Sequence, residues 1–134
     1  MKYKEKEFTS DLKEKIKNTE AALKSLIEKL VNENKPVFKK KGLDLDAEFE
    51  RLGNDPFHPG YSSSISIGIY DENCELTDLQ IIKIWECERH FLGVPVSKKI
   101  PGNKIAGDLL DESSEEIKQE LKDFIGEQLT ITND

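Results

Sequence analysis

Cysteine, histidine, methionine and tryptophan are scarce in this chain of 134 residues, which contains two, two, one and one of them. Cys74 and Cys87 lie outside any CxxC spacing, so the sequence predicts two reduced thiols and no disulfide framework. Long apolar runs are also missing: none approaches the ~20 residues of a membrane span, and the N-terminus lacks the apolar core of a signal peptide. We therefore expect a cytoplasmic protein that does not contact a membrane.

Recognisable catalytic motifs are absent, including phosphate-binding loops, dinucleotide fingerprints, HExxH and GxSxG. Cys87 and His90 are close in sequence, but residues three apart on a strand point to opposite faces. The carboxylates of Glu86 and Glu88 also disfavour a thiolate at Cys87. We expect no enzyme, catalytic residue, metal or cofactor. The alternative is a small metal- or ligand-binding enzyme built around Cys87, His90 and the nearby glutamates.

Charge is abundant and unevenly distributed. Residues 1–41 contain 12 lysines and 7 acidic residues, a net charge of +5, whereas residues 42–134 contain 8 basic and 20 acidic residues, a net charge of −12. The total of −7 argues against a nucleic-acid partner, because proteins that bind nucleic acid present a basic face. The uneven distribution favours association with a basic protein or a pairing of the two halves of the chain.

The clearest periodicity predicts a long N-terminal helix over Ser10–Glu33. Its apolar residues recur at spacings of three, four and seven: Leu12, Ile16, Leu23, Leu26 and Leu30. Pro36 predicts the end of this helix, and residues 37–42 are expected to form a connector. A short second helix is expected over Asp44–Leu52, because Leu45, Phe49 and Leu52 share one helical side and Gly53 follows.

The middle of the chain predicts a small antiparallel sheet. In Ser62–Tyr70 the residues Ile65, Ile67 and Ile69 alternate with polar or small residues, which is the period of a strand with one buried face. Gln80–Arg89 is rich in β-branched and aromatic residues and is expected to pair with that strand. Gly93–Ile100 is the candidate for a third strand, at an edge where Pro95 is tolerated.

The C-terminal part predicts a second long helix. Ser113 to Glu116 fits a capping box, and the residues expected to be buried after it are Ile117, Leu121, Phe124 and Ile125. The predicted fold class is therefore α+β, with a long N-terminal helix, a short second helix, an antiparallel sheet of two to three strands and a C-terminal helix. The whole chain, 1–134, is expected to form a single domain.

Two acidic segments are the candidate partner-binding residues. The first is Asp71, Glu72, Glu75 and Asp78, and the second is Asp108, Asp111, Glu112, Glu115 and Glu116. Both could be a solvated loop and a helix start favoured by its dipole. As a docking surface for a basic protein they would steer association electrostatically, with Trp85 or Tyr70 as an aromatic anchor.

A different use of the N-terminal helix is also open. Its positions 12, 16, 19, 23, 26 and 30 form a heptad-like seam that Thr19 interrupts. A homodimeric interaction or regulatory module assembled through this helix is therefore an alternative.

In size, acidity and lack of catalytic signatures the chain resembles the small bacterial immunity proteins, which neutralise a cognate toxin that is often a cationic nuclease. The resemblance covers these class properties, and no residue is carried over from it. It implies a toxin inhibitor whose carboxylates stand in for the phosphates of a nucleic acid in the basic site of the toxin.

Overall fold

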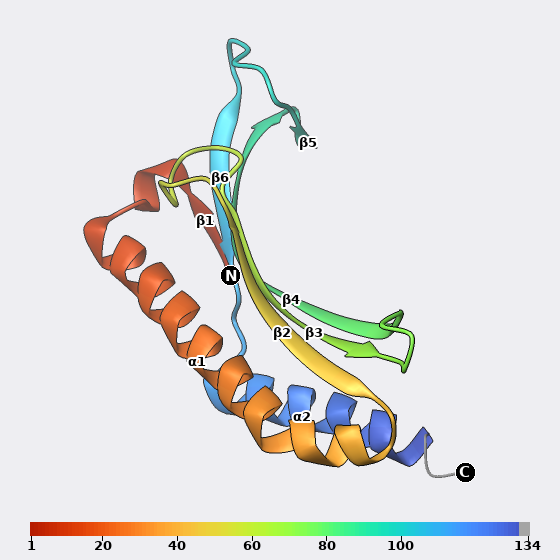
Figure 1. Cartoon of the computed structure of the whole chain (residues 1–134). Coiled ribbons are helices and arrows are strands. Elements are labelled where there is room, and N and C mark those ends of the chain that lie inside the picture. Colours follow the sequence, from red (N-terminus) through yellow and green to blue (C-terminus); the bar gives the residue numbers. More distant parts are fainter. Residues whose placement is uncertain (132–134) are drawn as a thin grey trace. The chain divides into compact units, whose positions relative to one another are not determined.

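Two helices and six strands make up the computed structural model of this chain, which describes residues 1–131 (Figure 1). The helices are α1 (Ser10–Lys40) and α2 (Ser114–Ile131). The strands are β1 (Lys2–Lys4), β2 (Asp44–Leu52), β3 (Ser62–Tyr70), β4 (Leu76–Phe91), β5 (Val94–Pro95) and β6 (Lys104–Leu109), and a 3₁₀ turn, η1, covers Glu5–Glu7. The strands form one antiparallel sheet in the order β1-β6-β4-β3-β2, and β5 pairs with β4.

The expected fold class was wrong in the size of the sheet and in the second helix. The sheet has six strands instead of two or three, and residues 44–52 form β2 instead of a helix. In β2 the residues Leu45, Ala47 and Phe49 alternate with the exposed Asp46 and Glu48, which is a strand period. Strand β2 pairs with β3 at one edge of the sheet. The hydrogen bonds of this pairing favour a strand over a helix for these residues.

Helix α1 continues past Pro36, where the sequence predicts its end. Phe38 lies fully buried in the last turns, and burial of this ring outweighs the hydrogen bond that proline cannot donate. The helix closes with a Schellman motif: Leu43 N–H donates to the carbonyl of Phe38, and Gly42 N–H donates to the carbonyl of Lys39. Gly42 has a φ of +75°, which glycine adopts without strain.

The chain divides into two compact units, and α1, β2, β3 and β4 each contribute to both. Unit 1 contains residues 1–21, 50–64 and 83–111, and unit 2 contains residues 22–49, 65–82 and the chain from Glu112 onward. Within residues 1–131, neither helix is long and apolar enough to cross a membrane.

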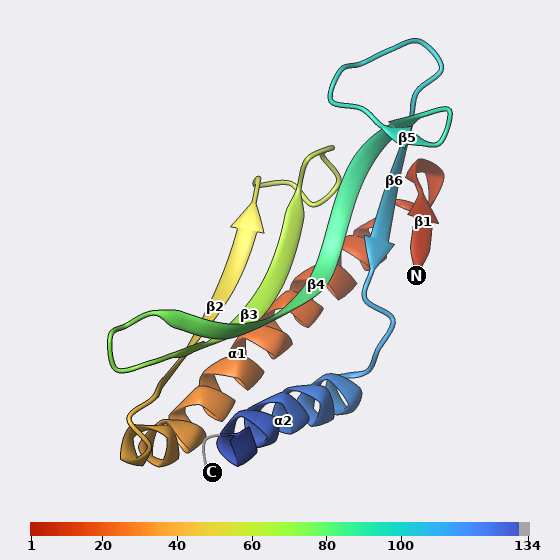
Figure 2. The ribbon, with the colours of Figure 1, turned by 90° about the vertical axis from the view of Figure 1, so that its right-hand side faces the viewer.

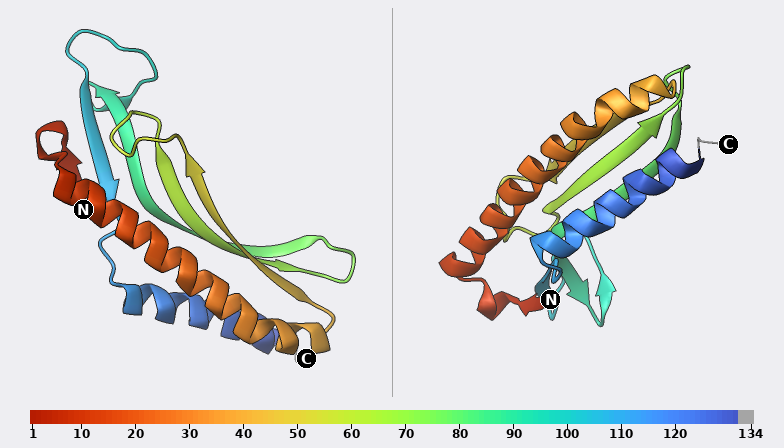
Figure 3. Two further views of the ribbon diagram at one scale, coloured as in Figure 1. Left: turned by 60° about the vertical axis from the view of Figure 1, so that its left-hand side comes forward. Right: turned by 90° about the horizontal axis from the view of Figure 1, so that it is seen from below.

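Unit 2 has an apolar core between its strands and its two helical segments, which lie on the same face of these strands (Figures 2 and 3). The strand predicted over Ser62–Tyr70 is confirmed as β3, with its three alternating isoleucines buried. The apolar residues expected to be buried in the C-terminal helix, Ile117, Leu121, Phe124 and Ile125, are buried in α2. The predicted helix start is also confirmed, because Glu116 N–H donates to Ser113 Oγ at 3.2 Å.

The apolar stripe of α1 is used inside the chain. Leu12 and Ile16 are buried in unit 1, and Leu23, Ile27 and Leu30 are buried in unit 2. A coiled-coil seam needs these side chains on the surface of the monomer. Four of the six seam positions are therefore buried within the chain, Thr19 and Leu26 are half-buried, and a homodimer through this helix stays a prediction.

Unit 1 has a mixed core in which one carboxylate is buried. Tyr61 Oη donates to Glu20 Oε2 at 2.7 Å, and both side chains are almost completely buried. Burial, followed by the hydrogen bond to Glu20, raises the pKa of Tyr61 well above its ordinary value, although Arg51 opposes this. The chain reaches Tyr61 through a β-bulge: Gly60 N–H donates to the carbonyl of Cys87, whose own N–H donates to the carbonyl of Tyr61.

Two strands of unit 1 were not expected from the sequence. Strand β6 pairs antiparallel with β4, with Trp85 opposite Leu109 and Cys87 opposite Gly107. Strand β1 pairs with β6 at the other edge of the sheet. The third strand expected over Gly93–Ile100 is reduced to the two residues of β5.

Candidate protein-docking surface

The turn between β3 and β4, in unit 2, is built by Asp71. Its Oδ1 accepts hydrogen bonds from the backbone N–H groups of Asn73 (2.9 Å) and Glu75 (3.0 Å). The backbone closes the same turn, since Asp71 N–H donates to the carbonyl of Glu75 at 2.9 Å. Asp71 is therefore a turn-forming residue, as aspartate commonly is through its short side chain. It positions Glu72 and Glu75, which are exposed.

An apolar cluster lies on the outer face of this hairpin. Leu76, Leu79 and Ile81 are 50%, 42% and 56% exposed. A Cβ at Gly68 would lie 3.1 Å from Leu76 Cδ1 and 3.2 Å from Tyr70 Cε2, so these two side chains cover the glycine. Large aliphatic side chains gathered in the open are typical of binding sites.

The orientation of β4 separates this cluster from the core. Asp78 and Gln80 face α2: Gln128 Nε2 donates to Asp78 Oδ2 at 2.7 Å, and Gln80 Nε2 donates to Glu120 Oε1 at 3.3 Å. Because side chains alternate along a strand, Leu79 and Ile81 face the opposite side. Leu76 has the parity of Asp78, and it is placed on the outer face by its contact with Gly68, whose neighbours Ile67 and Ile69 are buried in the core. Asp78 therefore belongs to the contact with α2 and does not lie beside the apolar cluster.

The outer face and the exposed carboxylates of the turn form the candidate site, which we call the hairpin surface: Tyr70, Glu72, Glu75, Leu76, Leu79 and Ile81. Glu72 Oε1 lies against Gly42 at the end of α1. Among residues 1–131, neither Glu72 nor Glu75 has an ion-pair partner. An apolar centre with charged residues at its rim is the usual anatomy of a protein interface. Tyr70 is half-buried and can contribute an aromatic edge.

Part of the second predicted acidic segment lies in unit 1. Asp108 Oδ1 is 3.2 Å from the ammonium group of Met1, and Asp111 Oδ2 is 4.0 Å from the same nitrogen. Both carboxylates are more than half exposed, and exposed ion pairs of this kind contribute little to stability.

The remaining residues, Glu112, Glu115 and Glu116, lie at the start of α2 in unit 2. Glu116 Oε1 accepts from Ser113 Oγ at 3.2 Å, and the positive end of the helix dipole favours Glu115. Residue 116 is 12 positions before Gln128, the α2 residue that contacts β4 near the hairpin, which is about 18 Å along a helix. This segment therefore does not extend the hairpin surface.

Trp85 is a core residue, so its prediction as a partner contact was wrong. It has no exposed surface, its Nε1 donates to the carbonyl of Pro56 at 2.6 Å, and its ring lies 5.8 Å from Phe8 and 6.3 Å from Phe57. A tryptophan with its polar atom satisfied internally cannot anchor a partner. The alternation of apolar residues in β4 breaks here, because Ile84 and Trp85 are both buried, and a strict period of two does not predict that.

The groups considered for an enzyme do not form a catalytic pair. Cys87 is buried, whereas Glu86, Glu88 and His90 are half-exposed at alternate positions of β4. Burial, with nearby carboxylates such as Asp55, raises the pKa of the Cys87 thiol to about 11, so the thiolate is disfavoured. His90 Nε2 lies 3.4 Å from Glu88 Oε2, and a hydrogen bond that the protonated carboxyl of Glu88 donates to Glu86 raises the pKa of Glu88. Among residues 1–131, no group of three or more His, Cys, Asp or Glu is placed to hold a metal ion.

The two thiols should differ sharply in reactivity. We expect an aromatic disulfide reagent at neutral pH to modify one thiol per native chain, because Cys74 is exposed and Cys87 is buried. The second thiol should react only after denaturation. Cys74→Ser should abolish the rapid reaction and Cys87→Ala should leave it unchanged; two rapid thiols in the native protein would contradict the burial of Cys87.

No family model, curated protein or solved structure matches this chain. A function must therefore be inferred from the surface residues of the chain itself.

Proposed function

We propose that the chain is a cytoplasmic binding protein of the immunity type, which inhibits a basic protein such as a nuclease toxin by covering its site with the hairpin surface. The observation that supports this most is that Leu76, Leu79 and Ile81 are exposed on a hairpin whose turn carries the exposed carboxylates of Glu72 and Glu75. Burying the aliphatic side chains supplies affinity, and the carboxylates favour a cationic partner.

The charge of the chain supports the same choice of partner. A net charge of −7 raises the encounter rate with a basic protein, and it repels nucleic acid. Carboxylates at the rim of the hairpin surface can occupy positions where a basic enzyme holds phosphates. An inhibitor of this kind needs no catalytic group, metal or cofactor of its own.

The test is binding of the full chain to the basic proteins encoded by neighbouring genes, measured by calorimetry and by inhibition of their activity. Leu79→Ser with Ile81→Ser should weaken binding by roughly 100-fold, because each truncates an apolar contact worth about 1–2 kcal/mol. Glu72→Gln with Glu75→Gln should slow association, with an effect that fades as salt rises.

Matched variants elsewhere in unit 2 keep this test specific. Val37 is 41% exposed on α1, so Val37→Ser controls for the loss of an exposed apolar side chain. Glu28→Gln with Glu127→Gln removes the same charge from exposed helix positions. Binding that ignores salt, or that falls equally in the control variants, would refute the proposal.

A further inference from the structure

The turn between β4 and β5, in unit 1, carries an unusual residue at its apex. Phe91 pairs with Val94 and His90 pairs with Pro95, so Leu92 and Gly93 form a two-residue hairpin loop. Both have positive φ, +53° and +80°, as a type I′ turn requires. Asparagine and glycine suit such turns, whereas a leucine in the left-handed region is strained.

Burial of the Leu92 side chain does not compensate for this strain. It is 86% exposed, and Val94 beside it is 59% exposed. An apolar side chain that strains the backbone and remains in water is best explained by a contact outside the chain.

The segment around this apex is basic, although it lies within residues 42–134, which carry a net charge of −12. Residues 89–107 include Arg89, Lys98, Lys99 and Lys104 and no aspartate or glutamate, whereas the chain carries a net charge of −7. We call residues 89–107 the basic hairpin. Lys98, Lys99 and Lys104 are exposed. Its charge is complementary to an anionic partner.

The acidic residues of β4 and β6 lie away from the apex, and Glu88 is the nearest of them. His90 pairs with Lys104 at the basic end, and Glu86 pairs with Asp108 four residues further along the ladder, a separation of about 13 Å. This exceeds the screening length of about 8 Å at physiological ionic strength. Glu88 lies between them and has His90 as a neighbour at 3.4 Å. An anionic surface that meets the apex therefore experiences mainly the positive charges.

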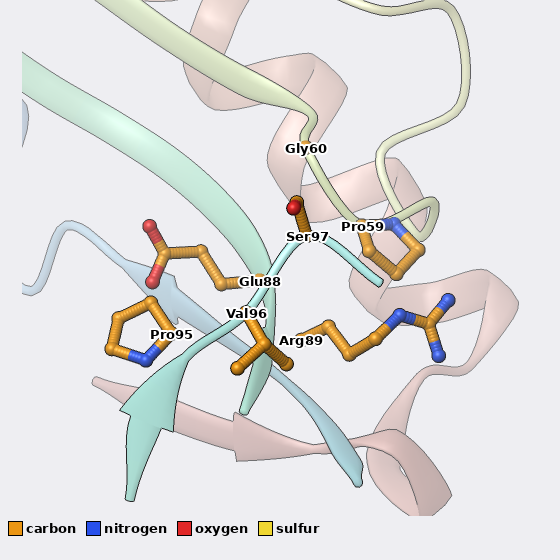
Figure 4. A pocket seen from close by; sticks show the side chains of 7 residues that line it. All are labelled: Pro59, Gly60, Glu88, Arg89, Pro95, Val96 and Ser97. Atoms are coloured by element: carbon orange, nitrogen blue, oxygen red, sulfur yellow. The ribbon is translucent and has the colours of Figure 1, made fainter. Parts of the chain in front are cut away.

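A groove of about 500 Å³ adjoins the base of the basic hairpin (Figure 4). Pro59, Gly60, Pro95 and Val96 form much of its lining, and Glu88, Arg89 and Ser97 supply polar groups. Arg89 donates one hydrogen bond to Asn103 Oδ1 at 2.9 Å, and a guanidinium has further donors. The groove therefore holds a cation, a hydroxyl and the carboxylate of Glu88 between apolar walls, and the binding of an anionic surface is carried by the exposed lysines of the basic hairpin.

We propose that the basic hairpin binds the surface of an anionic membrane, with Leu92 and Val94 inserted at the boundary of the acyl chains and the lysines at the headgroups. The apex offers aliphatic carbon, and three of the four Lys and Arg residues of the hairpin are exposed lysines. These two features are sufficient for binding to an anionic lipid surface, because buried apolar area and nearby basic residues both strengthen such binding. The proposal departs from the expectation of no membrane contact, which considered only spanning segments.

The test is cosedimentation of the full chain with vesicles of phosphatidylcholine alone or mixed with phosphatidylglycerol. We expect binding to the mixed vesicles to be at least roughly tenfold stronger and to fall as salt rises. Lys98→Gln with Lys99→Gln should abolish most of this preference. Lys15→Gln with Lys17→Gln, on the exposed side of α1, should leave it unchanged.

Leu92→Asn separates binding from folding, because asparagine suits the turn. This variant should keep or raise the melting temperature while weakening vesicle binding about tenfold, through loss of the inserted side chain. Equal binding to both vesicle types, or full binding by Leu92→Asn, would overturn the proposal. It would also be overturned if polyglutamate, but not vesicles, bound in a manner that depends on Lys98 and Lys99, since the basic hairpin would then be a site for an acidic protein.

Discussion

Replacing Gly107 by alanine is expected to cost about 3 kcal/mol of unfolding free energy, the upper part of the range for overpacked cores. A Cβ at this position would overlap Cη2 and Cζ2 of Trp85. The indole cannot move aside easily, because Tyr3, Phe8 and Phe57 surround it and its N–H is bonded to Pro56. Strand β6 or the ring must shift, and either movement breaks contacts in the core of unit 1.

The same substitution at Gly126 provides the control. Gly126 lies inside α2, and a Cβ there would have nothing within 4 Å. Gly126→Ala should therefore stabilise the protein by about 1 kcal/mol, since alanine is the better helix former. Urea unfolding of both variants gives the two free energies. Equal effects of the same sign would mean that Trp85 does not pack over Gly107.

Removal of the Tyr61 hydroxyl should be the second most damaging change. Tyr61→Phe leaves the buried carboxylate of Glu20 without the donor that lies 2.7 Å away, which should cost about 2–3 kcal/mol. The double variant Glu20→Leu with Tyr61→Phe should recover part of that loss, because it removes both partners. A double-mutant cycle by denaturant unfolding measures this coupling, and additive effects would show that the pair does not interact.

The pKa of Tyr61 adds a dependence on alkaline pH. Because the folded state raises this pKa above its ordinary value of 10.0, the neutral phenol is the stabilised form. Its contribution is complete below pH 10 and is lost as the pH rises above that value. Tyr61→Phe should therefore flatten the alkaline limb of the stability curve, and an unchanged slope would assign that limb to other groups.

Elements with strong local signals were predictable from the sequence. The alternation of Ile65, Ile67 and Ile69 identified β3, and the Ser113 cap with Ile117 and Leu121 identified α2. The start of α1 was also predictable, because its apolar stripe begins at Leu12, whose N–H donates to Thr9 Oγ1 at 3.2 Å. In each case the local pattern and the tertiary contacts agree.

Elements that depend on distant partners were missed. In β2 the spacing of Leu45 and Phe49, with Ala47 and the acidic residues around them, fits a helix. The pairing of this segment with β3 makes it a strand instead. Strand β6 has little local signal, because its Gly107 is required by the ring of Trp85 on another strand. The sequence predicts the end of α1 at Pro36, but the helix continues to Lys40 because Phe38 is buried in the core.

The candidate site was only partly predictable for the same reason. The sequence indicated the acidic turn, and Glu72 and Glu75 are exposed there. It could not separate them from Asp71, which builds the turn, or from Asp78, which binds Gln128. The outward position of Leu79 and Ile81 depends on which face of β4 meets α2, so the apolar half of the hairpin surface required the fold.

Strand β2 leaves one side of the sheet open, and such an edge can pair with another chain. On this strand Asp46, Glu48 and Glu50 are exposed at every second position. Two copies approaching edge to edge would bring these rows of like charge together, and mutual repulsion opposes their pairing. The acidity of this strand thus opposes fibre-like self-assembly through the edge of β2 that faces away from β3, where the described residues place no further strand.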